Sequence, residues 1–96
     1  MGTRAARVTD MCSGHGCWPP RPAIGNCPRV FLEGLPAHRQ GDSWAAHCCK
    51  SCHSSALCMG SPRVYTCGQQ QGRQLDPVCC GSVVSFPCAQ RIFVGP

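Results

Sequence analysis

The chain is poor in acidic residues, in aromatic residues and in long apolar runs. Only four of its 96 residues are Asp or Glu, aromatics make up 6%, and one lysine accompanies eight arginines. No stretch approaches the roughly 18 apolar residues of a membrane-spanning helix. No apolar run follows the N-terminal arginines, as a secretory signal peptide would require. We therefore expect a protein made in the cytoplasm without a signal peptide.

Cysteine, glycine and proline are abundant instead, with 11, 11 and 9 copies. A single domain of this length has little room for a core and usually needs disulfides or a metal. Thiols stay reduced in the cytosol, and an odd number of cysteines cannot pair completely. We therefore expect thiolate ligands and free thiols rather than disulfides. The surplus cysteines are expected to be small buried hydrophobes, namely Cys27, Cys58, Cys67 and Cys88.

Two short motifs recur along the chain. Arg-x-x-Asp occurs at Arg7/Asp10, Arg39/Asp42 and Arg73/Asp76, and Arg-Val/Ile-aromatic occurs at residues 29–31, 63–65 and 91–93. Self-similarity at a period of roughly 30 residues is typical of repeat architectures. We interpret the chain as one domain, 1–96, with repeats at about 5–28, 29–62 and 63–96.

The spacing of these motifs predicts β-hairpins. β-Branched and aromatic residues favour strands, and a glycine lies where each hairpin would turn. The hairpins are expected at about 28–42 and 62–76, and a third is split between Arg91–Val94 and Ala5–Val8. Meeting termini would remove exposed sheet edges. The predicted fold is small and all-β: a pseudo-three-fold cone of short β-hairpins with long Cys/His-rich loops.

The loops between the hairpins contain a candidate metal site. His15 and His47 each lie five residues after a repeated aspartate, and Cys80 lies four residues after one. Equivalent loop positions converge in a three-fold arrangement, and His53 from the long second loop supplies a fourth ligand. Three histidines and a cysteine suit tetrahedral zinc, with iron as second choice.

Other roles for these residue types remain open. Cys49-x-x-Cys52 could be half of a zinc knuckle or a redox pair, although no βαβ pattern surrounds it. His38 lies inside a predicted hairpin, and we expect it to be a structural hydrogen-bonding residue.

Several segments resemble the PAAR-repeat family, and the resemblance covers roughly residues 4–95. They are Ala5–Met11 with Gly14–Cys17, then Cys27–Phe31, His38–Asp42, Ser61–Tyr65 and Cys80–Ser82. The resemblance implies a cone that caps the trimeric β-helical spike of type VI secretion systems and contractile phage tails. It also implies an apical metal held by three histidines and a cysteine, here His15, His47, His53 and Cys80.

The sequence departs from this family pattern at identifiable places. Thr9 and Leu75 replace the glycine of the usual Val-Gly-Asp. Cysteines also adjoin the ligand positions, so a neighbouring thiolate could replace a histidine; they are Cys12, Cys48, Cys49 and Cys79.

The predicted function is therefore mechanical and non-enzymatic. The expected partners are a spike trimer and, transiently, a target membrane, with no nucleic acid and no small-molecule substrate. The protein would be made in a bacterial cytoplasm and end in a virion tail or be secreted by the type VI apparatus. Three alternative functions are an intracellular zinc-binding adaptor for protein or nucleic acid, a secreted disulfide-rich module, and an enzyme with a Cys–His pair.

Overall fold

The protein is built from short antiparallel strand pairs. The computed structural model describes residues 2–95, and within that range it contains no helix, hence none long and apolar enough to cross a membrane. The strands are β1 (Thr3–Arg4), β2 (Cys27–Leu32), β3 (Leu35–Ala37), β4 (His47–Cys49), β5 (Ser51–His53), β6 (Tyr65–Thr66), β7 (Gln69–Gln70) and β8 (Phe93–Val94). They pair as β1–β8, β2–β3, β4–β5 and β6–β7. The prediction of a small all-β fold is confirmed, whereas the pseudo-three-fold cone stays a prediction.

Two hairpins turn at the expected glycines. Glu33 and Gly34 join β2 to β3, Cys67 and Gly68 join β6 to β7, and all four residues have positive φ angles. Two consecutive positive φ values define the type I′ turn, whose twist matches that of the flanking strands. The glycine positions therefore determine where each hairpin reverses.

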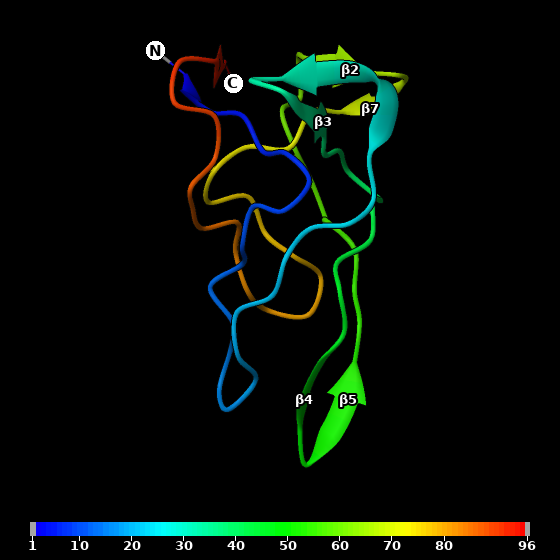
Figure 1. Cartoon of the computed structure of the whole chain (residues 1–96), viewed down its shortest axis with the longest axis vertical. Coiled ribbons are helices and arrows are strands. Elements are labelled where there is room, and N and C mark those ends of the chain that lie inside the picture. Colours follow the sequence, from blue (N-terminus) through cyan, green and yellow to red (C-terminus); the bar gives the residue numbers. More distant parts are fainter. Residues whose placement is uncertain (1, 96) are drawn as a thin grey trace.

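The two ends of the chain lie side by side, because β1 pairs with β8 (Figure 1). The expected return strand, Ala5–Val8, is wrong in its bounds, since the paired residues are Thr3–Arg4. Beyond β1 the chain turns into the molecule, where Ala5 forms an isolated bridge with Arg73 and Arg7 forms one with Ala37.

A closed cycle of backbone hydrogen bonds joins the three repeats. Ala6 N–H donates to the Gly72 carbonyl (2.9 Å), Gly72 N–H to His38 (2.9 Å) and His38 N–H to Ala6 (3.1 Å). Each of these residues directly precedes a repeated arginine. The buried Gln71 amide nitrogen donates to the same three carbonyls at 3.0–3.2 Å. The three copies therefore contact one another in cyclic order.

Each Arg-x-x-Asp motif forms the same tight turn. The arginine N–H donates to its aspartate at 2.8 Å, and the two side chains form an ion pair in every copy. The third residue of the turn has a positive φ: Thr9 (79°), Gly41 (86°) and Leu75 (75°). Such a turn favours glycine at that position. Thr9 and Leu75, the two departures from the family pattern, thus adopt a backbone conformation that favours glycine.

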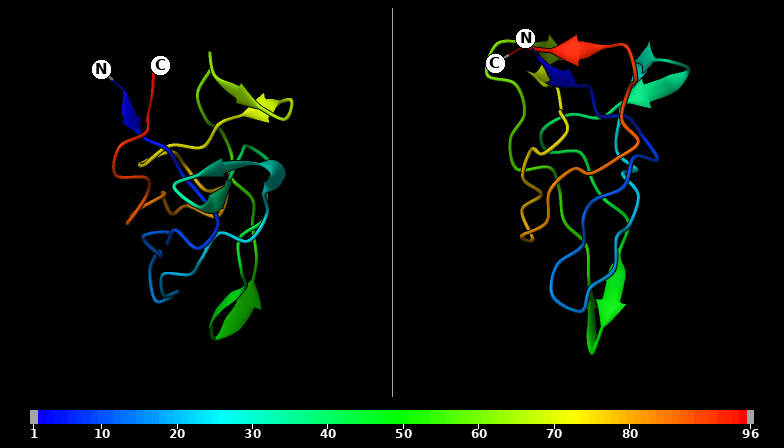
Figure 2. Two further views of the ribbon diagram at one scale, coloured as in Figure 1. Left: turned by 45° about the horizontal axis from the view of Figure 1, so that its top comes forward. Right: turned by 90° about the vertical axis from the view of Figure 1, so that its left-hand side faces the viewer.

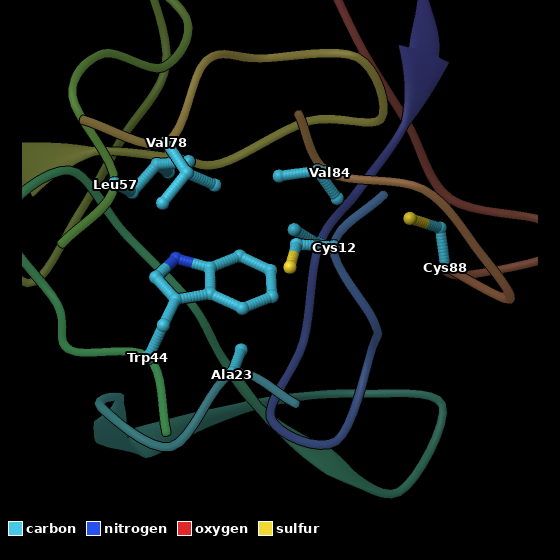
Figure 3. Close-up of a cluster of buried hydrophobic side chains, with 8 residues drawn as sticks. Cys12, Ala23, Trp44, Leu57, Val78, Val84 and Cys88 are labelled. Atoms are coloured by element: carbon cyan, nitrogen blue, oxygen red, sulfur yellow. The ribbon is translucent and has the colours of Figure 1, made fainter. Parts of the chain in front are cut away.

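The core follows directly from these turns. Cys12, Trp44 and Val78 each lie two residues after a motif aspartate, and each bridges a buried residue of another repeat. Their respective partners are Val84, Ala23 and Leu57. Ala6 and Cys88 complete this buried cluster, which surrounds the Trp44 indole (Figure 3). The core is therefore small and is built from equivalent positions of the three repeats.

The molecule is elongated, with extents of 38 × 25 × 21 Å. The strand pairs β1–β8, β2–β3 and β6–β7 gather at the broad end with the termini, and the β4–β5 hairpin forms the opposite, narrow end (Figures 1 and 2). We refer to these as the hairpin end and the narrow end.

The expectation of mainly free thiols is wrong. Eight of the eleven cysteines form disulfides: Cys17–Cys49, Cys27–Cys67, Cys48–Cys52 and Cys58–Cys79. Three of these bonds join residues 21–40 positions apart, which only the folded chain brings together. Four cysteines were expected to be free and buried. Cys27 is buried but forms a disulfide, Cys58 and Cys67 are exposed and also form disulfides, and of the four only Cys88 is both free and buried.

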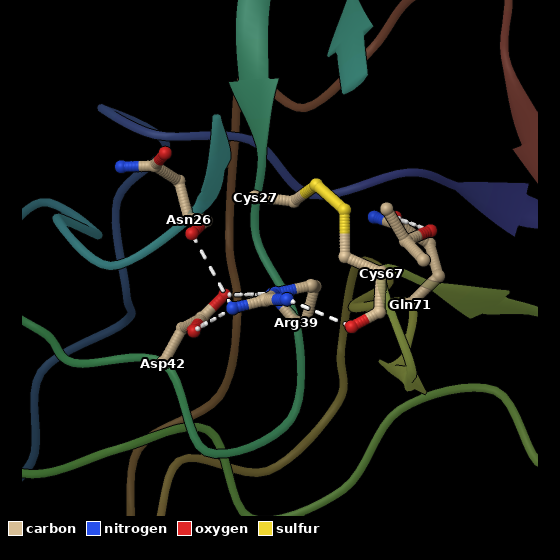
Figure 4. The surroundings of a disulfide bond; sticks show 7 residues. Asn26, Cys27, Arg39, Asp42, Cys67 and Gln71 are labelled. Carbon is tan, nitrogen blue, oxygen red and sulfur yellow. Dashed lines mark hydrogen bonds and ion pairs between the residues drawn. A yellow bond between two sulfur atoms is a disulfide. The ribbon is translucent and has the colours of Figure 1, made fainter. Parts of the chain in front are cut away.

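The Cys27–Cys67 bond connects the β2–β3 hairpin to the β6–β7 hairpin, beside one of the repeated turns (Figure 4). Arg39, paired with Asp42, also donates to the carbonyls of Asn26 (3.3 Å) and Cys67 (3.2 Å). The disulfide and the arginine thus fasten the same two segments.

Candidate metal centre

The β4–β5 hairpin aims two histidines in one direction. His47 pairs directly with His53, and Cys48 pairs with Cys52 at the next position. Because successive side chains of a strand point to opposite faces, the two histidines share one face and the Cys48–Cys52 disulfide lies on the other. This hairpin was not predicted, since Lys50 rather than glycine takes the positive φ at its turn (63°).

A tight loop before Trp18 positions the third histidine. His15 and Trp18 exchange backbone hydrogen bonds of 3.0 and 2.8 Å. Gly14 has φ 74°, and a Cβ there would lie 2.6 Å from the Trp18 carbonyl oxygen. Glycine is therefore required for the loop to close this tightly.

The four predicted ligands lie together in the folded chain. One donor atom from each of His15, His47, His53 and Cys80 can be chosen so that all lie within 4.8 Å of one another. The Nε2 atom of His53 is 3.1 Å from that of His15 and 2.8 Å from that of His47. Nitrogens bound tetrahedrally to zinc at about 2.0 Å would lie about 3.3 Å apart. The cluster could therefore hold a metal ion with little movement.

Hydrogen bonding leaves lone pairs inside this cluster. His47 Nδ1 lies 2.7 Å from the Pro19 carbonyl oxygen, which can only accept a hydrogen bond. The neutral ring therefore carries its proton on Nδ1, and its Nε2 has a free lone pair that can bind a metal. One proton on His53 Nε2 can satisfy only one of its two nitrogen neighbours. A backbone carbonyl that fixes a histidine tautomer is a common outer-shell feature of metal sites. The chemistry of the donor set thus fits a bound cation.

The surroundings of Cys80 favour its thiolate. Burial raises the pKa of Cys80, but hydrogen bonds with Ser82, Arg21 and His53 outweigh burial and lower the pKa to about 5. The Arg21 guanidinium lies 3.4 Å from the Cys80 sulfur and 3.1 Å from that of Cys12. A thiolate is the form that binds metals.

Two residues of the site escaped the sequence analysis. Trp18 stacks on His15 at a ring distance of 5.2 Å, also lies 5.1 Å from His53, and donates its indole N–H to the Ser51 carbonyl. Arg21 is buried and meets Cys80 from 59 positions away. No local spacing signals the contacts of Trp18 with His53 and Ser51 or of Arg21 with Cys80, because these loops meet only after folding.

His38 lies apart from the cluster, inside the core. Its ring donates from Nδ1 to the Gly25 carbonyl at 2.7 Å and packs edge-on against Trp44 at 5.0 Å. The structure thus gives His38 the hydrogen bond expected of a structural residue.

The chain also matches a known protein family. The family model for the PAAR motif matches residues 14–85, which is 72 of the 96 residues. The chain belongs to the PAAR family. That family is structural and is associated with spike-tip proteins of type VI secretion systems and phage tails. No curated protein matches this PAAR chain.

Proposed function

We propose that this PAAR protein is a non-enzymatic tip that caps a trimeric β-helical spike. In this proposal the hairpin end docks on the spike, and the narrow end leads through a target membrane. The protein is made in a bacterial cytoplasm and leaves it in a phage tail or through a type VI apparatus. It needs neither nucleic acid nor a small-molecule substrate.

The observation that carries the proposal is a set of equivalent exposed aromatics at the hairpin end. Phe31, Tyr65 and Phe93 each follow a repeated Arg-Val/Ile pair, and each is 58% exposed. Large apolar side chains are usually buried, and exposed groups of them mark interaction surfaces. Three matching anchors on one chain suit a partner that repeats one binding position three times.

Unpaired charge accompanies these aromatics. All four side-chain carboxylates are engaged by arginine side chains or backbone N–H groups within the molecule. Among the described residues, Arg29, Arg63 and Arg91 are exposed and form no ion pair. Charge complementarity contributes mainly to association rate and specificity. We therefore expect acidic groups on the spike around an apolar centre.

The metal has a mechanical role in this proposal. His15, His47, His53 and Cys80 would bind zinc, with iron as second choice, when the metal is present. These residues come from the His15 loop, the β4–β5 hairpin and the loop of Cys80. Cys80 packs against the main core cluster, but among the described residues neither core cluster includes any of the three histidines. Metal binding in small zinc domains contributes on the order of 10 kcal/mol to folding. The ion would therefore hold the narrow end rigid where burial cannot.

The test is binding to recombinant trimeric spikes, one from a type VI apparatus and one from a contractile phage tail. We expect one PAAR chain per spike trimer, and Tyr65→Ala should weaken binding about tenfold, as loss of an interface anchor does. Leu75→Ala is the matched control, since Leu75 is 69% exposed but lies in a turn rather than a hairpin strand. Failure to bind either spike, or equal effects of both substitutions, would overturn the proposal.

A further inference from the structure

Each predicted metal ligand has a bonded cysteine close by in sequence. Cys17 lies two residues after His15, Cys49 lies two residues after His47, and Cys79 directly precedes Cys80. Cys48 and Cys52 adjoin the two hairpin histidines. Among the described residues the free cysteines are Cys12, Cys80 and Cys88, and of these only Cys80 belongs to the cluster.

We propose that the Cys17–Cys49 disulfide sets the ligand composition of the metal centre. The inference rests on the metal-binding part of the proposed function. A thiolate is a strong ligand for zinc and for softer metals, so reduced cysteines beside the histidines would compete with them. A disulfide withdraws both of its sulfurs from that competition. Cys80 then remains the one sulfur donor beside three imidazoles.

The pleat of the β4–β5 hairpin distinguishes this bond from the Cys48–Cys52 disulfide of the same hairpin. Cys49 shares the face of His47 and His53, because it lies two positions along the strand from His47. Cys48 and Cys52 point to the opposite face. A thiol freed at Cys49 could therefore reach the cluster, whereas one freed at Cys48 could not.

The same bond also ties together the elements that supply the three imidazoles. Cys17 belongs to the loop that carries His15, and Cys49 belongs to the hairpin that carries His47 and His53. Its Cα atoms lie 5.8 Å apart, within the range that disulfides bridge. One cross-link thus removes two competing thiols and holds the histidine-bearing segments side by side.

The bond forms by exchange with a low-molecular-weight disulfide such as oxidised glutathione. One cysteine thiolate attacks that disulfide and releases a thiolate, and the second cysteine then displaces the other half. The protein loses two electrons and two protons, and the small disulfide is reduced to two thiols. No other reactant is needed.

Cobalt(II) is the probe, because a thiolate bound to cobalt gives a charge-transfer absorption that an imidazole does not. The Cys80→Ser variant in its oxidised form should lack this band. Its cobalt affinity should fall by more than the roughly 10- to 100-fold that loss of an outer-shell partner costs. Adding Cys17→Ser frees Cys49 and should restore the band. Adding Cys52→Ser instead frees Cys48 and should not.

The two double variants are matched, since each lacks one disulfide and carries one new free thiol. A band in both, or in neither, would overturn the inference. If the unsubstituted protein binds no cobalt at all, the metal-binding part of the proposed function fails with it. If that protein binds cobalt normally but the Cys17→Ser/Cys80→Ser variant shows no band, only the role of the disulfide is refuted. Cys88→Ser, which alters a free cysteine outside the cluster, should leave the spectrum unchanged.

Discussion

The Nε2 atoms of His47 and His53 lie 2.8 Å apart, and the two residues pair directly across the β4–β5 hairpin. His47 donates its Nδ1 proton to the Pro19 carbonyl, and this hydrogen bond leaves the lone pair of Nε2 inside the cluster. Strand pairing thus brings two nitrogen donors together, and the tautomer of one leaves it able to bind a cation.

Replacing a cluster residue should remove the metal. We expect the purified protein to contain about one equivalent of zinc or iron, and His47→Ala or Cys80→Ser to lose most of it. Thermal stability should fall in parallel, because metal binding contributes to folding in domains of this size. Elemental analysis and calorimetry on the same samples measure both quantities.

His38→Gln is the control for this experiment, since it changes a histidine that hydrogen-bonds to Gly25 outside the cluster. It should keep the metal content of the parent. Full retention of metal by both cluster variants would refute the site.

The turns of the Arg-x-x-Asp motifs predict opposite effects of glycine and alanine. Leu75 is exposed with φ 75°, so Leu75→Gly gives up little burial and relieves the left-handed conformation. That conformation costs roughly 1–2 kcal/mol, and glycine loses about 0.5–1 kcal/mol of chain entropy, so we expect a net gain of about 0.5–1 kcal/mol. Gly41→Ala should lose about 1 kcal/mol.

The comparison at Gly41 isolates backbone strain, because a Cβ there would meet nothing within 4 Å. Urea denaturation of the three proteins gives the free energies of unfolding. A stable Gly41→Ala variant together with a destabilised Leu75→Gly variant would contradict this account of the turns.

The free energy of unfolding should decrease as the pH is lowered, partly because of His38. Burial lowers the pKa of this imidazole below its ordinary value of 6.5, so the unfolded chain takes up a proton at a pH where the folded chain does not. Stability from this group is present above pH 6.5 and is lost as the pH falls from there toward the folded pKa, by at most about 1.4 kcal/mol per pH unit.

The measurement is the free energy of unfolding between pH 7.5 and 5.5 for the parent and for His38→Gln. The difference between the two slopes isolates His38, since the cluster histidines are common to both proteins. Identical slopes would show that His38 titrates alike in both states.

Much of the fold could be predicted because its signals are local. Glycine beside a β-branched and aromatic run indicates a hairpin, and Gly34 and Gly68 turn the chain where expected. The offsets from the repeated aspartates also pointed to His15, His47 and Cys80, three of the four residues that the structure brings together. The β4–β5 hairpin was missed because Lys50 occupies the turn position that usually signals one.

The cysteines could not be predicted in the same way. The expectation of free thiols depended on the compartment and on an odd count, and an odd count requires only that one cysteine stay unpaired. The bond Cys27–Cys67 spans 40 positions, and no spacing in the sequence distinguishes that partner from others.

The sequence by itself determined the repeat, the turn positions and the residue types available for a metal, because these depend on neighbours along the chain. Only the tertiary structure decided which cysteines form disulfides, which nitrogen of His47 faces the cluster, and that the Arg21 guanidinium lies beside Cys80. Those outcomes depend on distances between loops, and the cyclic contacts among Ala6, His38 and Gly72 set these distances only once all three repeats have closed on one another.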